Sequence, residues 1–306
     1  MDGGTRAGIG RFRDGRAERR FRAAYEVAMG LWPPHEVFDV ETSFGTTRVY
    51  RCGPRDGEPV VLLHGHGANA SMWYLQAAGV GCHRPVYAVE TIDDPGGGVQ
   101  RRVVTGSGDS AAWLEEVLAG LGLERVHLVG LSYGGWLALN QAVYGARRLA
   151  SVTLLDPGGL ARVPLRFMVT LLVTLLAMAA PPSWRRALYR VVAEWALVGR
   201  PEIMAPVVAG ARGFRPDRSP ARRFGDEELA RVAVPVQLIV GGRSSLVRPA
   251  EVVERARRLL PVVHAEVVPG VGHAVALEAP ELVNDRLVAF ADRCRGGGGR
   301  SPGPDA

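Results

Sequence analysis

The stretch VHLVGLSYGG, residues 126–135, decides how this 306-residue chain folds. An apolar strand leads into a G-x-S-x-G turn, and a helical pattern starts at once, with no room for a loop. A serine on such a sharp turn holds its hydroxyl out at the edge of a sheet, and glycines flank it because only hydrogen fits at the crossing. The stretch predicts a serine nucleophile at Ser132. The alternative is an ordinary turn between a strand and a helix.

On both sides of this stretch, apolar strand runs alternate with helical patterns along most of the chain. Continuous apolar runs are expected of strands that are buried on both faces. The alternation therefore predicts an α/β fold, with a mostly parallel central sheet and helices on both of its faces. We expect strands at residues 36–42, 46–52, 59–63, 85–89, 126–129, 149–155, 234–240 and 265–268. The first two, joined by residues 43–45, are predicted to form a hairpin.

The same patterns divide the chain into a core and additions to it. Residues 36–160 and 225–294 carry the alternating strands and helices of the core. Residues 1–35 form an N-terminal arm with an arginine-rich helix predicted at residues 11–31. Residues 161–224 show helical patterns, several prolines and no strand signal, which indicates a helical insertion. The Gly/Pro-rich tail, residues 295–306, is predicted to be disordered.

Composition excludes several classes of protein. The formal net charge is +6, but every basic residue is an arginine, a bias typical of a GC-rich genome, and no nucleic-acid-binding motif is present. We therefore expect no nucleic-acid partner. The three cysteines are widely spaced and form no C-x-x-C pair, so neither a disulfide framework nor a metal site is predicted. No cofactor is expected.

The segment most like a membrane helix is the apolar run at residues 167–180. It is too short for a typical span, and a buried or substrate-facing helix is the better interpretation. The N-terminal region lacks the long apolar segment of a secretory signal. We therefore expect a cytoplasmic protein without an integral membrane segment, and its oligomeric state stays open.

A serine nucleophile needs a base and a place for the oxyanion that it creates. His273 lies in the glycine-rich stretch PGVGHA, residues 269–274, directly after the last predicted strand, from which it could reach the serine. The alternative is a histidine on a surface loop. The backbone N–H groups of Tyr133 and His66 are the candidate oxyanion donors. His64 is interpreted as a residue that stabilises the turn, because no third ligand accompanies His64 and His66 as a metal pair.

The motifs HGHG, GLSYGG and GVGHAVALEAPE, in this order, resemble the α/β-hydrolase fold family over about residues 36 to 293. The helical insertion is similar to the cap of that family. The segments LLHGHGANASMWY and GLSYGGWLALNQAVY most resemble bacterial members of the carboxylesterase type. The resemblance implies a serine hydrolase with the chain order serine, acid, histidine, although this fold carries many chemistries.

The chain departs from the family pattern at the acid. Many members carry it in a run like G-x-x-D after the penultimate strand, but GGRSSLVR, residues 241–248, contains no carboxylate. Asp156, at the carboxyl end of the strand after the elbow helix, is the favoured substitute, although DPGG is also a good turn signal. Asp93, Asp94 and Glu278 remain alternatives.

These residues predict an acyl-enzyme route to hydrolysis of a carboxylic ester or related acyl bond. Ser132 attacks the carbonyl, and His273 accepts its proton and returns it to the leaving alcohol. Dehalogenases and epoxide hydrolases resemble this pattern but carry aspartate at the elbow. The second hypothesis is a non-hydrolytic protein of the same fold, either a binding protein or a lyase or cyclase of secondary metabolism. The missing carboxylate near Ser244 favours it.

The substrate is expected to be a hydrophobic small molecule held under the insertion. Trp73 and Tyr133 are predicted to border its pocket. The helical run at residues 164–180 and four aromatic residues of the insertion are candidates for an apolar wall, or else they pack the cap on the core. These aromatic residues are Trp184, Tyr189, Trp195 and Phe214.

Overall fold

A computed structural model describes residues 9–162, 164, 165, 167, 169, 173, 200–216 and 221–295. Most of the helical run predicted at residues 164–180 lies outside the described residues. So do Trp184, Tyr189, Trp195 and all of the predicted tail except Arg295.

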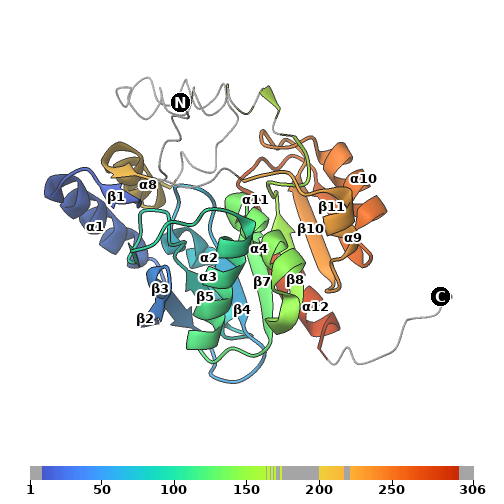
Figure 1. The fold of residues 1–306 in the computed structure, drawn as a ribbon, viewed down its shortest axis with the longest axis horizontal. Coiled ribbons are helices and arrows are strands. Elements are labelled where there is room, and N and C mark those ends of the chain that lie inside the picture. The colour runs from blue at the N-terminus through green and yellow to red at the C-terminus, as the bar shows by residue number, and fades with distance from the viewer. Residues whose placement is uncertain are drawn as a thin grey trace, which may run out of the picture.

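A nine-stranded, mostly parallel sheet runs through the middle of the molecule (Figure 1). Its strands are β2 (Glu36–Thr42), β3 (Gly45–Cys52), β4 (Val60–Leu63), β5 (Val86–Val89), β6 (Val99–Gln100), β7 (Val126–Leu131), β8 (Leu149–Leu155), β10 (Val236–Gly241) and β11 (Val263–Val268). The order is β11-β10-β8-β7-β4-β5-β3-β2, with β6 beside β3. All pairs from β11 to β5 are parallel, whereas β3 is antiparallel to β5, β6 and β2. The predicted fold class and hairpin are confirmed.

Helices cover both faces of this sheet. One face packs against α3 (Ser107–Gly120), α4 (Tyr133–Tyr144) and α10 (Pro249–Leu259). The other face packs against α1 (Gly15–Met29), η1 (Ala70–Trp73), α2 (Tyr74–Gly81) and α12 (Pro280–Arg293). Three short helices, η2 (Ala146–Arg148), α9 (Asp226–Ala230) and α11 (Val275–Glu278), lie between these elements in the chain.

The central strands are apolar on both faces because each face contributes to a separate core. In β7, Leu128 belongs to the core under α3, α4 and α10, and its neighbour Val129 belongs to the core on the opposite side. Leu63 and Leu62 of β4 divide in the same way. Successive side chains of a strand point to opposite faces, so a two-sided sheet requires the unbroken apolar runs that the sequence contains.

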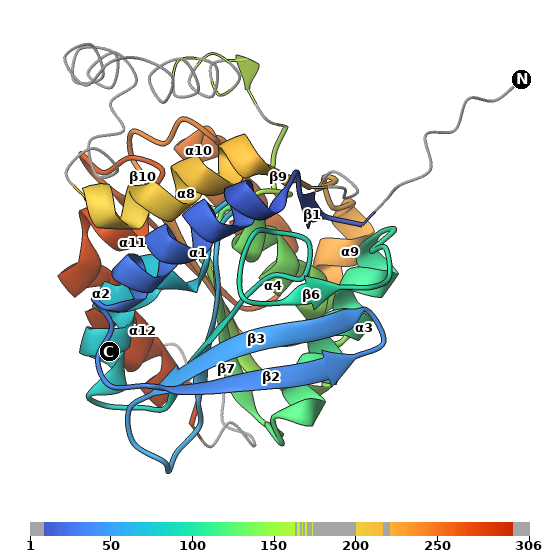
Figure 2. The ribbon, with the colours of Figure 1, turned by 90° about the vertical axis from the view of Figure 1, so that its left-hand side faces the viewer.

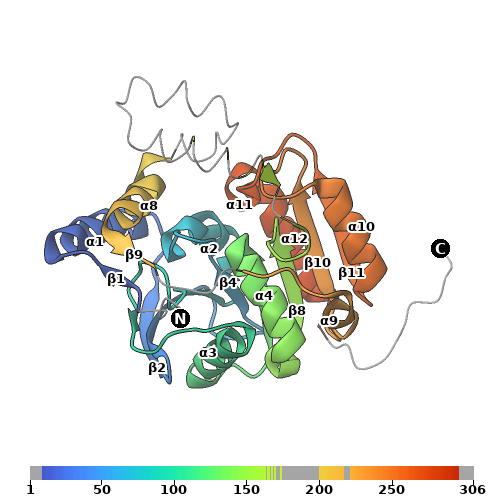
Figure 3. The same cartoon turned by 45° about the horizontal axis from the view of Figure 1, so that its top comes forward.

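The N-terminal arm pairs with the end of the insertion. Helix α1 lies beside α8 (Pro201–Gly213), and β1 (Arg11–Phe12) pairs antiparallel with β9 (Phe214–Arg215) (Figures 2 and 3). The expectation that the insertion contains no strand is therefore wrong at these two residues. The helix predicted from residue 11 starts at Gly15, where the Asp14 side chain accepts a hydrogen bond from the Ala17 backbone. Strands of two residues are too short to show an alternating pattern.

Glycines allow the strand and helix of the elbow to cross closely. A Cβ atom at Gly130 would lie 2.0 Å from the carbonyl oxygen of Gly134, and one at Gly134 would lie 2.1 Å from that of Leu63. Backbone atoms cannot yield as flexible side-chain ends do. The flanking glycines of the motif are therefore required by packing, independently of any chemistry.

Gly134→Ala is expected to lower the free energy of unfolding by about 3 kcal/mol, because the added methyl group overpacks backbone against backbone. Urea denaturation measures the change. Gly108→Ala is the matched control, because a Cβ atom there meets nothing within 4 Å, and its effect should stay below about 1 kcal/mol. Equal stabilities of the two variants would contradict the packing account.

Candidate active site

The carboxyl ends of neighbouring parallel strands gather the predicted site residues at one edge of the sheet. Ser132 follows β7, Asp156 follows β8, and His273 lies in the loop after β11. The turn that carries His66 follows β4, which pairs with β7. Ligands of open α/β sheets bind at this edge.

Ser132 and Asp156 share a backbone conformation that is unusual for their residue types. They have φ angles of 57° and 43° and are the only non-glycine residues with positive φ among the residues that the structure describes. Backbone hydrogen bonds hold both turns: the Ser132 N–H donates to Leu155 at 3.0 Å, and the Asp156 N–H donates to Ile239 at 2.9 Å. Such strain persists where the surroundings over-determine it, and it gathers at active sites.

The Asp156 carboxylate is completely buried and holds three hydrogen bonds. Its Oδ2 atom lies 2.5 Å from Nδ1 of His273 and accepts from the Ser244 hydroxyl, also at 2.5 Å. Its Oδ1 atom accepts from the Gly241 N–H at 3.2 Å. The structure thus brings Asp156 and His273 together. Ser244, which was not predicted as a site residue, orients that acid through its hydroxyl.

The contact with Asp156 sets the hydrogen-bonding roles of the His273 ring. The Nδ1–H group donates a hydrogen bond to the carboxylate, which leaves Nε2 as an acceptor in the neutral ring. The side chain is 18% exposed, and the Phe167 ring meets it edge-on with centroids 6.3 Å apart. The ring is therefore largely covered but still accessible.

The other candidate acids bind different groups at this edge. Asp93 accepts from the Tyr133 hydroxyl at 3.2 Å, and Glu278 accepts from the backbone N–H of Gly272 at 2.8 Å. Asp94 accepts from the Gly67 N–H and from the Thr91 hydroxyl, each at 3.0 Å. Glu278 thus braces the loop of the histidine, and Asp94 braces the turn after β4.

That turn lies against the serine. A Cβ atom built on Gly65 would be 3.4 Å from Cβ and 3.9 Å from Oγ of Ser132. The His66 side chain is 59% exposed, with Nδ1 3.6 Å from Asp94. Tyr133 is the first residue of α4. Of the two candidate oxyanion donors, His66 therefore lies in the turn beside the serine, and Tyr133 directly follows the serine in the chain.

His64 lies fully buried beneath the turn. Its Nδ1 atom donates to the Gly65 carbonyl at 2.9 Å, and its Nε2 atom accepts from the Thr91 N–H at 3.1 Å. Burial pulls the pKa of His64 down, but the Glu90 carboxylate, 3.4 Å from Nε2, contributes to a net rise. His64 thus has the turn-stabilising place predicted for it, and no cluster of three or more potential metal ligands occurs in the described part of the chain.

Glu90 connects this turn to the N-terminal arm. Its Oε1 atom accepts from the Ala70 N–H at 3.0 Å and from the hydroxyl of Tyr25 on α1. Burial, together with this carboxylate, raises the pKa of Tyr25 well above its ordinary value. Helix α1 is thereby linked to the floor of the site through a buried hydrogen bond.

A pocket of about 620 Å³ opens over the serine. Its described lining consists of His66, Ser132, Tyr133, Gly158, Gly159, Ala161, Arg162, Phe167, Pro216, Ala221, Arg223 and Leu246. Trp73, expected at its border, is instead fully buried in the core. Phe214 is also absent from this described lining and packs against Phe12, with ring centroids 5.1 Å apart.

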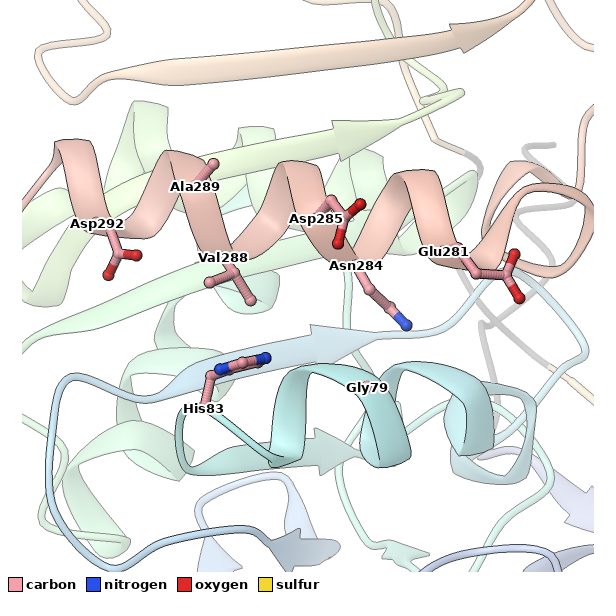
Figure 4. Close-up of a pocket in the computed structure, with 8 residues that line it drawn as sticks. All are labelled: Gly79, His83, Glu281, Asn284, Asp285, Val288, Ala289 and Asp292. Carbon is pink, nitrogen blue, oxygen red and sulfur yellow. The ribbon is translucent and has the colours of Figure 1, made fainter.

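A second hollow, of about 510 Å³, lies between α2 and α12 (Figure 4). Asn284 of α12 points toward α2 at Gly79, where a Cβ atom would lie 2.1 Å from the amide nitrogen. His83, which follows α2, faces α12. This hollow contains none of the predicted site residues.

Ser244→Ala is expected to lower kcat about tenfold, because Asp156 loses a buried hydrogen bond to its charged form. Steady-state kinetics with a p-nitrophenyl ester measure the loss. Ser110→Ala is a matched control, since the buried Ser110 hydroxyl donates to the carbonyl of Gly106, the residue before α3. An unchanged kcat in folded Ser244→Ala would show that Ser244 does not orient the acid.

A serine on a strand-to-helix elbow and a histidine paired with a buried carboxylate, at the edge of a mostly parallel sheet, define a hydrolase-type α/β protein. The chain belongs to the Alpha/beta hydrolase family, whose model matches residues 60–286. The resemblance seen in the motifs is confirmed.

The relatives include bacterial carboxylesterases over nearly the whole chain. The chain is 31% identical to carboxylesterase YbfK of Bacillus subtilis (strain 168) over 284 residues, covering 89% of this chain and 93% of that protein. It is similar to the structure of naproxen esterase (carboxylesterase NP) from Bacillus subtilis, with a TM-score of 0.81 and 28% identity, covering 91% and 99% of the two chains. None of the described helices is long and apolar enough to cross a membrane.

Proposed function

We propose that this protein is a serine carboxylesterase that acts through an acyl-enzyme intermediate. The observation that carries the proposal is the 2.5 Å contact between Nδ1 of His273 and the buried Asp156 carboxylate, at the sheet edge where Ser132 follows β7. The similarity to carboxylesterases over about nine-tenths of the chain supports the same reaction class.

In the first half-reaction, His273 Nε2 removes the Ser132 proton as Oγ attacks the ester carbonyl. Asp156 holds the ring through Nδ1 and stabilises the imidazolium that forms. The imidazolium then protonates the leaving alcohol, and the acyl group stays on Ser132. In the second half-reaction, His273 activates a water molecule, which releases the acid and restores the serine.

The oxyanion of each tetrahedral intermediate is assigned to the backbone N–H groups of His66 and Tyr133. The proximity of Gly65 to Ser132 supports this assignment, as does the positive N-terminal end of α4. His64, Glu90 and Asp94 brace the turn from below and would keep its amides in place before substrate arrives.

The alternative, a non-hydrolytic binding protein, lyase or cyclase, drew its support from the missing carboxylate at residues 241–248. Asp156 lies within hydrogen-bonding distance of Ser244 in that segment and also contacts His273. The observation that favoured the alternative therefore has another explanation, and hydrolysis is the better supported function.

A fluorophosphonate probe tests the proposal directly. We expect covalent labelling that peptide mass spectrometry maps to Ser132, because the probe reacts with activated serines. A series of p-nitrophenyl esters of graded acyl length then measures the chain-length preference. Folded protein that neither reacts with the probe nor hydrolyses any ester of the series would overturn the proposal.

A further inference from the structure

Among the described residues that line the pocket over the serine, two are arginines and none is a carboxylate. Arg162 and Arg223 are both exposed, and the described lining residues include no aspartate or glutamate. The rest of that lining is mostly apolar or glycine, including Ala161, Phe167 and Leu246. The pocket therefore combines apolar surface with a positive rim.

The buried side chain of Arg255 links the two chain segments that carry Arg162 and Arg223. Arg255 donates to the Leu160 carbonyl at 2.5 Å and to the Phe224 carbonyl at 2.8 Å. The Phe224 N–H in turn donates to the Gly159 carbonyl at 3.0 Å. Arg162 is two residues from Leu160, and Arg223 adjoins Phe224. The backbone segments that carry Arg162 and Arg223 are thus held together, and both arginines line the pocket.

Neither rim arginine forms an ion pair with a described carboxylate, whereas nearby arginines do. Arg222 binds Glu228, and Arg255 binds Asp226 at 2.6 Å. The field of Arg223 also reaches Asp226, but that carboxylate is already paired with Arg255. Positive charge at the pocket is therefore left available to a ligand.

We infer that the substrate is an ester with a carboxylate at the end remote from the bond that is cleaved, such as a monoester of a dicarboxylic acid. The inference rests on the proposed function and adds its substrate class. The apolar lining would hold the chain between the two groups, Arg162 and Arg223 would bind the free carboxylate, and Ser132 would attack the ester. Arginine suits this role because its planar donors match a carboxylate.

The test compares monoethyl adipate with the ester in which the free acid is replaced by a primary amide. Wild-type protein should show about tenfold higher kcat/KM for the acid. Arg162→Gln and Arg223→Gln should each lower that preference about threefold, since partly solvated ion pairs contribute modestly. High sodium chloride should lower it as well. Arg231→Gln, at an exposed arginine paired with Glu227 on α9, should retain the wild-type preference.

A wild-type preference for the amide, or an equal loss of preference in Arg231→Gln, would overturn the inference. A binding measurement tests the inferred carboxylate site independently of the proposed hydrolysis. Calorimetry on Ser132→Ala should show tighter binding of the acid than of the amide. Arg162→Gln and Arg223→Gln, combined in that variant, should remove the difference. Acid-selective binding without any ester hydrolysis would refute the esterase and retain the anion site, whereas hydrolysis without selectivity would do the reverse.

Discussion

Ser132→Ala is expected to lower kcat for a p-nitrophenyl ester by about five orders of magnitude and to abolish fluorophosphonate labelling. In the proposed mechanism Ser132 forms the acyl-enzyme, so its loss leaves only the modest rate that the oxyanion donors and substrate binding supply. Stopped assays at high protein concentration measure the residual rate, and intact-mass spectrometry measures the labelling.

Stability must be followed beside activity in this variant. The positive φ of residue 132 strains any side chain with a Cβ atom, so alanine relieves nothing and the fold should persist. Ser71→Ala, at a buried serine whose hydroxyl donates to Asn69, is a suitable control and should keep most of the activity. Labelling that survived in Ser132→Ala would place the nucleophile elsewhere.

Asp156→Asn is expected to lower kcat by about four orders of magnitude while substrate binding persists. An amide cannot stabilise the imidazolium, and its NH₂ group would favour the wrong tautomer of His273. Asparagine is the right replacement because it tolerates positive φ, so the turn after β8 should survive. Measuring kcat together with the affinity for a non-hydrolysed analogue separates lost chemistry from lost binding.

The alternative acids supply the comparison for this prediction. Asp94→Asn and Glu278→Gln remove charges that brace backbone N–H groups at the same edge, and each should cost about tenfold or less. A nearly silent Asp156→Asn combined with a severe Asp94→Asn would show that the acid has been assigned to the wrong residue.

Much of the fold could be predicted from the sequence because its signals are local. The apolar runs of β4, β7, β8 and β10 required burial on both faces, and the glycines around Ser132 required a tight crossing. The proximity of Asp156 to His273 was expected only from the shared sheet edge. The contact between Asp156 and His273 agrees with that expectation, and the catalytic role of Asp156 stays a prediction.

Other features depend on contacts between distant residues. Ser244 meets Asp156 because β8 and β10 are neighbours, and the long insertion between them hides this in the sequence. Trp73 follows the turn after β4 and was expected at the pocket, but η1 directs it into the core. The pairing of β1 with β9 and the link from Tyr25 to Glu90 likewise join segments with no shared local signal.

The hydrogen bond between Ser244 and Asp156 limits which side chains can stand at position 244. Because the two side-chain oxygens are 2.5 Å apart, an aspartate at position 244 would compete with Asp156 for the same small volume beside His273. Two carboxylates there would repel each other unless one kept a proton. Only one ionised carboxylate therefore fits beside His273, and a short hydroxyl donor such as serine is compatible with Asp156 at that position.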